Sequence, residues 1–287
     1  MNKTLMQKQI QWYPGHMFKS MREIRERLKI IDLVIILLDA RLPFSSMNPE
    51  ILKTVKMKPV LLLFNKSSLA DPNRLSYHVQ KYEEMGFTGL NIDAISRMNV
   101  NKIHRLAQDL LKDKLERAKA KGLKERPIRT IILGIPNVGK STLINTLAQR
   151  KAARTANTPG ITRAQQWIKL SSDFELLDTP GVLWPKFDDP KVAYHLAITG
   201  AIKDDIMPLD NVCHYALKFL KQYYPDRLLE RYEIPHEMDD IGQMLHQIGV
   251  KRGALLKGGA IDELRVYQII LTDIRNKQLG GLTFDRT

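Results

Sequence analysis

The sequence predicts an α/β fold, with a mostly parallel sheet that carries helices on both faces, followed by an all-α region. Two apolar runs, at 32–39 and 59–64, show no alternation of polar and apolar residues, which is typical of parallel strands buried on both faces. A third apolar run, at 128–133, leads through a glycine-rich turn into a helical pattern at 141–147. After residue 188, apolar residues recur at helical spacing and no clear strand interrupts them.

The glycine-rich turn at 134–141 reads GIPNVGKS and fits the phosphate-binding pattern G-x-x-x-x-G-K-[ST]. A strand before it and a helix after it are the context that this pattern requires, which disfavours an ordinary turn with a surface lysine. The glycines let backbone N–H groups turn toward a phosphate, while Lys140 adds a cation and Ser141 a hydroxyl for Mg²⁺. The residues predicted to hold the nucleotide phosphates are Pro136, Asn137, Val138, Gly139, Lys140, Ser141 and Thr142.

A second phosphate-side element is Asp178-Thr179-Pro180-Gly181, which follows two paired strand patterns at 166–170 and 174–177. Asp178 lies 38 residues after Lys140, where the acidic residue that holds Mg²⁺ belongs. The N–H of Gly181 is expected at the γ-phosphate, so Lys140 and Gly181 are predicted catalytic groups.

The polar segment 151–163 lies between the two phosphate-side elements and contains a Pro-Gly break. It is predicted to form a mobile loop in which Thr162, or alternatively Thr158, brings a hydroxyl to Mg²⁺.

Asn65 and Lys66 follow the strand at 59–64 and are similar to the start of the guanine-reading element N-K-x-D. Asn65 would join neighbouring loops and contact the base, and the Lys66 stem would cover the purine ring, although two such residues also occur for purely structural reasons. The fourth position holds Ser68 instead of Asp. A hydroxyl cannot accept two N–H groups as a carboxylate does, so we expect weaker base discrimination. Asp71, three residues after Ser68, could take the place of the missing aspartate, but the spacing of the element does not support this.

Residues 93–96 follow the next short strand pattern, where the backbone amide of Ser96 or Ala94 is expected at the base. Nucleotide switch proteins usually place the phosphate loop first and these base-reading elements last. Here the order is reversed, so the sheet is predicted to be circularly permuted, with residues 112–129 joining the old termini.

The chain resembles the circularly permuted GTPases, and most of all the bacterial ribosome biogenesis GTPase A (YlqF) family. The segments that carry the resemblance are WYPGHM (12–17), DARLPFSSMNP (39–49), NK (65–66), GIPNVGKS (134–141), TPGIT (158–162) and DTPGVLWPKF (178–187). The resemblance implies binding of GTP and GDP with Mg²⁺, GTP hydrolysis, and a role late in assembly of the large ribosomal subunit. It also implies contact with rRNA and stimulation of hydrolysis by the precursor particle.

The group that orients the attacking water is not the usual glutamine, because Val182 occupies the position after Gly181. The resemblance implies His16 in this role; a turn residue or an RNA contact is the alternative. It also implies that Asn137 helps to hold a monovalent cation such as K⁺. If neither group acts, the protein would instead be a nucleotide-dependent RNA-binding assembly module with little catalysis of its own.

The net charge of +14 is concentrated in residues 1–130, which hold 25 Lys and Arg against 13 Asp and Glu. This asymmetry favours a polyanionic partner, most simply RNA, over ordinary solvated helix faces. Much of the charge lies on a predicted basic helix within 12–31.

The expected domains are a GTPase domain at 1–187 and a helical, RNA-binding-like domain at 188–287. No apolar run is long enough to span a membrane, no signal peptide is visible, and Cys213 is the single cysteine. We therefore expect a cytoplasmic protein, monomeric in solution, with no membrane partner.

Overall fold

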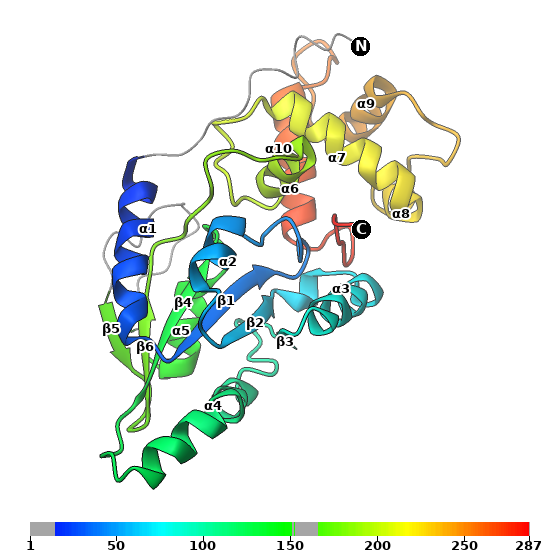
Figure 1. Cartoon of the computed structure of the whole chain (residues 1–287). Helices are drawn as coiled ribbons and strands as arrows, with labels where there is room; N and C mark the ends of the chain where they lie inside the picture. Colours follow the sequence, from blue (N-terminus) through cyan, green and yellow to red (C-terminus); the bar gives the residue numbers. More distant parts are fainter. Residues whose placement is uncertain (1–14, 151, 153–165, 287) are drawn as a thin grey trace.

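The computed structural model describes residues 15–150, 152 and 166–286, apart from the side chains of residues 15 and 16. Within this part of the chain, six strands form one sheet in the order β3-β2-β1-β4-β6-β5 (Figure 1). The strands are β1 (Leu33–Asp39), β2 (Val60–Asn65), β3 (Thr88–Asn91), β4 (Ile128–Gly134), β5 (Gln166–Lys169) and β6 (Phe174–Asp178).

The centre of the sheet is β1, which pairs in parallel with β2 on one side and with β4 on the other. All seven residues of β1 are buried, as expected for a strand covered on both faces. Only β5 runs antiparallel, against β6. The carboxyl ends of β1, β2, β4 and β6 therefore lie along one edge of the sheet, where α/β proteins bind ligands.

Helices α1 to α5 surround the sheet (Figure 1). Their bounds are α1 (Gly15–Arg27), α2 (Pro49–Val55), α3 (Pro72–Glu84), α4 (Lys102–Ala120) and α5 (Lys140–Ala148). The α-helix predicted to reach Ile31 ends at Arg27 and continues as a 3-10 turn, Leu28–Ile30. Ile31 is already extended, because the chain enters β1 two residues later.

The C-terminal part is helical, as predicted, with α7 packed against its neighbours in a small bundle. The helices are α6 (Pro190–Ile198), α7 (Leu209–Tyr223), α8 (Pro225–Tyr232), α9 (Ile241–Lys251) and α10 (Glu263–Arg275). The predicted fold class, a permuted α/β sheet followed by a helical region, is confirmed.

Two helices, α2 and α8, were not predicted. The side chain of Asn48 caps α2 by accepting the N–H groups of Glu50 and Ile51, and Pro49 opens its first turn. Pro225 opens α8 in the same way.

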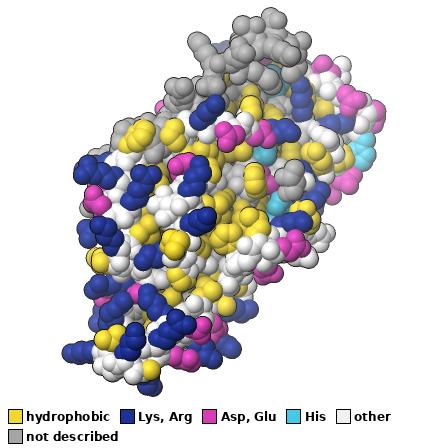
Figure 2. All heavy atoms as spheres, viewed as in Figure 1, with side chains coloured by type: hydrophobic (Ala, Val, Ile, Leu, Met, Phe, Trp, Pro, Cys, Tyr) yellow, Lys and Arg dark blue, Asp and Glu magenta, His cyan; other side chains and the backbone are white. Residues whose placement is uncertain are grey.

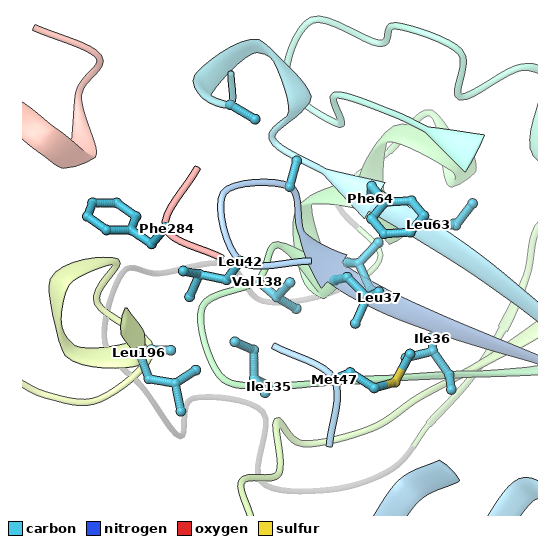
Figure 3. Packing of buried hydrophobic residues seen from close by; sticks show 14 of the residues in the cluster. Ile36, Leu37, Leu42, Met47, Leu63, Phe64, Ile135, Val138, Leu196 and Phe284 are labelled. Atoms are coloured by element: carbon cyan, nitrogen blue, oxygen red, sulfur yellow. The ribbon is translucent and has the colours of Figure 1, made fainter. Parts of the chain in front are cut away.

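The last residues of the chain return from α10 to the sheet. Asp285 accepts the backbone N–H groups of Phe44 and Ser45, at 2.7 and 2.8 Å. Figure 3 shows Phe284 and Leu196 on the same side as Leu42, which follows the central strand. The helical bundle is thus fastened to the loop at the carboxyl end of β1.

Candidate nucleotide site

The phosphate loop joins β4 to α5 and is folded tightly. Gly139 has a φ of +103°, and a Cβ at this position would lie 2.4 Å from Asn65 Nδ2, so only glycine fits. The ammonium group of Lys140 is buried and donates to the carbonyl oxygens of Gly134 (3.1 Å) and Ile135 (2.9 Å). Ser141 and Thr142 follow in the first turn of α5, where both are half-buried.

Asp178 ends β6 and is 2% exposed. Burial raises the pKa of its carboxyl to about 6, although the charge of Lys140 partly offsets this. Burial also lowers the pKa of Lys140 to about 8, with Asp178 acting in the opposite direction. Asp178 Oδ1 has no hydrogen-bond partner among the described residues. A buried carboxylate oxygen with no donor suits a hard cation such as Mg²⁺.

The loop after β6 lies directly on the phosphate loop. A Cβ on Gly181 would stand 2.7 Å from both the Cα and the nitrogen of Pro136, so the two backbones meet here. The next residue, Val182, is 1% exposed and donates its N–H to Gly134 O at 3.1 Å. Its carbonyl accepts from Asn48 Nδ2 at 3.1 Å. Val182 therefore offers a water molecule neither a polar side chain nor access.

Asn65 joins three segments at the base side of the site. Its Nδ2 donates to Val138 O at 2.8 Å, and its Oδ1 accepts the N–H of Ala94 at 3.0 Å. Lys66 has a φ of 59°, and its ammonium donates to Asp39 Oδ2 (3.1 Å) and to Asn137 O (2.7 Å). The strand ends of β1 and β2 are thus tied to the phosphate loop.

A buried ion pair supports this arrangement. Arg41 is 2% exposed and donates from Nε and Nη2 to the two oxygens of Asp39, at 2.9 and 2.7 Å. Burial would raise the pKa of Asp39, but Arg41 and Lys66 hold it far below its usual range. The sequence analysis gave Arg41 no role. The signal that could have indicated one is Asp39, an acidic residue at the end of a buried strand, which needs a cationic partner.

A cavity of about 630 Å³ lies beside these base-side residues, within the range of small-ligand pockets. Lys66, Ser68 and Asp93 form part of its wall, and Asn137 lies where it meets the phosphate loop. Gly200 and the residues near it line it from the helical bundle. The cavity is therefore bounded by both parts of the chain.

The two backbone amides predicted to face the base, those of Ala94 and Ser96, donate hydrogen bonds within the protein. Ser96 donates its N–H to Asp93 Oδ1 at 3.0 Å, and the N–H of Ala94 is bonded to Asn65. Ser96 does line the cavity, but its amide is turned to Asp93. In this structure both amides donate to side chains of other residues, and their role at the base stays a prediction.

Comparison with known proteins identifies the family. The model of the 50S ribosome-binding GTPase family matches residues 129–222. Ribosome biogenesis GTPase A of Bacillus pumilus is 48% identical over 277 residues, covering 96% of this chain and 98% of that protein. The chain belongs to the ribosome biogenesis GTPase A family. Mitochondrial ribosome-associated GTPase 1 of Mus musculus is 34% identical and spans 84% of this chain and 76% of its own length.

A solved structure supports the fold of this GTPase. GDP-bound YlqF has a TM-score of 0.66 at 22% identity, covering 92% of this chain and 99% of that one. A second structure, GNP-bound YlqF from T. maritima, has a TM-score of 0.65. These matches extend over both the sheet and the helical bundle.

Two predicted residues of the GTPase site fall outside the described structure. Thr162, with its alternative Thr158, lies in the segment 153–165, which is not described. His16 belongs to α1 by its backbone, but its side chain is outside the described set. The geometry of the site thus bears on neither role.

The surface of the GTPase is strongly basic on one side. Figure 2 shows Lys and Arg side chains gathered along the left and lower parts of the molecule, over α1 and α4 as placed in Figure 1. The exposed basic residues of α1 and α4 include Lys19, Arg22, Arg25, Arg27, Lys102, Arg105, Lys112, Lys114, Arg117 and Lys119. No helix among the described residues is both long and apolar enough to cross a membrane.

Proposed function

We propose that this protein binds and hydrolyses GTP and acts late in assembly of the bacterial large ribosomal subunit. The observation that carries the proposal is the pair of buried charged residues Lys140, in the phosphate loop, and Asp178, at the end of β6, beside the contact of Gly181 with that loop. A cation and an acid held at this position are what phosphoryl transfer from a Mg²⁺-bound nucleotide requires. The 48% identity to ribosome biogenesis GTPase A supplies the cellular process.

The burial of Lys140 and Asp178 supports the following roles for residues on the phosphate side. Lys140 would neutralise the β- and γ-phosphates, and the loop amides at 136–142 would cradle them. Ser141, Asp178 and Thr162 would hold Mg²⁺, which when bound neutralises phosphate charge and fixes the phosphate oxygens. Gly181 would donate its N–H to the γ-phosphate, as the contact of its backbone with Pro136 allows.

The water-orienting group proposed is His16. Val182 is buried and apolar, so another residue must align the attacking water, and an imidazole titrates near neutral pH. Replacement of His16 by Ala should reduce turnover without reducing affinity for GDP. Unchanged ribosome-stimulated turnover in this variant would exclude the role.

A monovalent cation held partly by Asn137 is proposed to supply positive charge that other GTPases take from an arginine. Asn137 has a φ of 56° and lies between Lys66 and the helical bundle. Turnover should be faster in K⁺ than in Na⁺ at equal ionic strength. Equal rates in the two salts would contradict the proposal.

The proposed partner is rRNA within the precursor particle, because the exposed basic residues of α1 and α4 form a positively charged surface of the kind that contacts nucleic-acid phosphates. We also propose that residues 1–187 and 188–287 act as two domains of a cytoplasmic monomer. Limited proteolysis tests the division into two domains, and light scattering tests the monomeric state.

A second candidate function is a nucleotide-dependent RNA-binding assembly module, favoured by the burial of Val182. The deciding experiment measures GTP and ATP hydrolysis with and without large ribosomal subunits, in K⁺ buffer at fixed salt. GTP-selective stimulation supports the GTPase. Binding of GTP without stimulated turnover supports the module.

A further inference from the structure

Ser68 occupies the position at which the base-reading element N-K-x-D has its aspartate, and it contacts a carboxylate from another loop, that of Asp93. Ser68 lies in a 3-10 turn, Ser67–Leu69, immediately after Lys66. Its hydroxyl donates a short hydrogen bond to Asp93 Oδ2, from a loop 25 residues further along the chain. Both side chains line the cavity of about 630 Å³. A carboxylate is therefore present at the base side of the site, although it comes from the neighbouring strand end.

The carboxylate of Asp93 is held in a fixed orientation. Its Oδ1 accepts the N–H groups of Ile95 and Ser96 at 3.1 and 3.0 Å, which leaves Oδ2 on the side of Ser68. Asp93 is 5% exposed. Burial would raise its pKa, but the hydrogen bonds from the Ser68 hydroxyl, the two amides and the Ser96 side chain lower it, so the group is ionised at neutral pH.

The pair can only accept hydrogen bonds from a ligand. An ionised carboxylate has no proton to donate, and the single hydroxyl proton of Ser68 is already given to Asp93. Ser68 Oγ keeps its lone pairs, and the ionised Oδ2 keeps capacity for a further donor. Two adjacent acceptors thus lie in the cavity wall, one of them on the residue that holds the fourth position of the element, where N-K-x-D carries its aspartate.

We infer that Ser68 and Asp93 together read the guanine base, by accepting its N1–H and its exocyclic N2–H. This inference rests on the proposed function, because it assigns the specificity of the same nucleotide site. Adenine presents an unprotonated N1 at this edge, which would face the two acceptors without a shared proton. Hypoxanthine keeps N1–H but lacks the second donor, so it would bind with intermediate affinity.

The direct test replaces Asp93 by Asn in the full-length chain. The Asn oxygen can still accept the N–H groups of Ile95 and Ser96, so the loop keeps its turn, while Oδ2 becomes an N–H₂ donor. Dissociation constants for GDP, IDP, XDP and ADP are measured by calorimetry. D93N should lose about 10- to 100-fold in affinity for GDP. It should gain affinity for XDP, because the xanthine carbonyl at C2 accepts from the new amide.

The matched control is Asp71→Asn, the same chemical change three residues after Ser68. Asp71 caps α3 by accepting from Asn73 and Arg74, and Asn caps helices equally well. D71N should bind GDP and XDP as the parent protein does. A shift in base preference in D71N and not in D93N would overturn the inference in favour of Asp71.

A second variant pair guards against misfolding. D93S should lose GDP affinity, and the exchange S68D/D93S should restore it by returning the carboxylate to the fourth position. Unchanged base selectivity in D93N, or no rescue by the exchange, overturns the inference. If the parent protein itself binds no guanine nucleotide, the proposed function fails instead, and the two failures are thereby distinguished.

Discussion

Asn137 in the phosphate loop donates its side-chain amide to the backbone oxygen of Gly200, at 2.8 Å. Gly200 lies in the turn that follows α6, in the helical bundle. Arg275 of α10 holds this turn by donating to Ala197 O and Ile198 O, at 2.8 and 2.9 Å. The loop that would carry phosphate is thus linked through one turn to two helices of the bundle.

Replacement of Asn137 by Ala should therefore loosen the bundle from the phosphate loop. We expect a loss of about 1 kcal/mol in the free energy of unfolding, from the hydrogen bond to Gly200. Urea denaturation measures this loss. Asn73→Ala, at an exposed position of α3, is the control and should cost less. An equal loss in both variants would contradict the link.

Gly181→Ala should separate catalysis from binding. The added methyl would lie 2.7 Å from backbone atoms of Pro136, so the loop after β6 must move away from the phosphate loop. We expect at least a tenfold fall in GTP turnover and little change in GDP affinity. Gly242→Ala in α9, where the methyl would meet only one side-chain oxygen of Asp240, at 3.1 Å, is the control. Normal turnover in G181A would exclude a role for this contact.

Asp285→Asn should destabilise the attachment of the last residues to the sheet. Burial would raise the pKa of Asp285, but hydrogen bonds from His195 and Ser45 lower it, so the native group is an anion that accepts four bonds. Loss of the charge should cost about 2 kcal/mol in the free energy of unfolding. Asp239→Asn, which changes an exposed carboxylate that pairs with Lys221, should cost less. Thermal denaturation of the two variants compares them.

Asp32 gives a pH dependence of stability. Burial would raise its pKa, but Arg126 and Lys114 lower it from 3.8 to about 2. A lowered native pKa stabilises the fold above pH 3.8, and this contribution is lost as the pH falls from about 4 to 2. Because both partners are half exposed, we expect D32N to cost about 1–2 kcal/mol at pH 7.

The measurement is urea denaturation of the parent protein and D32N at pH 7, 4 and 3. The difference between them should shrink toward pH 3, since below pH 3.8 the Asp32 carboxyl takes up a proton in the unfolded parent chain, and folding must then release it. A difference that is independent of pH would show that the ion pairs do not stabilise the fold.

Much of the fold could be predicted because its determinants are local. The apolar strands and the turn at 134–141 each lie within one short stretch of sequence. Helix α2 was not predicted, although Asn48 and Pro49 are a typical helix cap and first helical residue. Both residues were assigned to the loop that follows β1. The capping signal of α2 was therefore present in the sequence, but the polar, proline-containing segment around it favoured a loop.

The contacts between distant segments could not be predicted. Nothing in the sequence places the hydroxyl of Ser68 against Asp93, because their meeting depends on β2 and β3 ending side by side. The same holds for Asp285 and Ser45, which are 240 residues apart. The sequence therefore indicated which residues face the nucleotide phosphates, and left open how a base would be discriminated.

The strand order has a consequence for how the chain folds as it leaves the ribosome. Strands β1, β2 and β3 emerge first and can pair with one another, but β1 belongs at the centre of the finished sheet. Until β4 is synthesised, the entire edge of β1 offers unpaired backbone groups to any other strand. The phosphate loop follows β4 directly, so the nucleotide site begins to assemble as that edge is covered. During synthesis there should therefore be an interval in which β1 is open to pairing with a wrong strand. A chaperone would protect the chain most in this interval, and a slow translation step would prolong it.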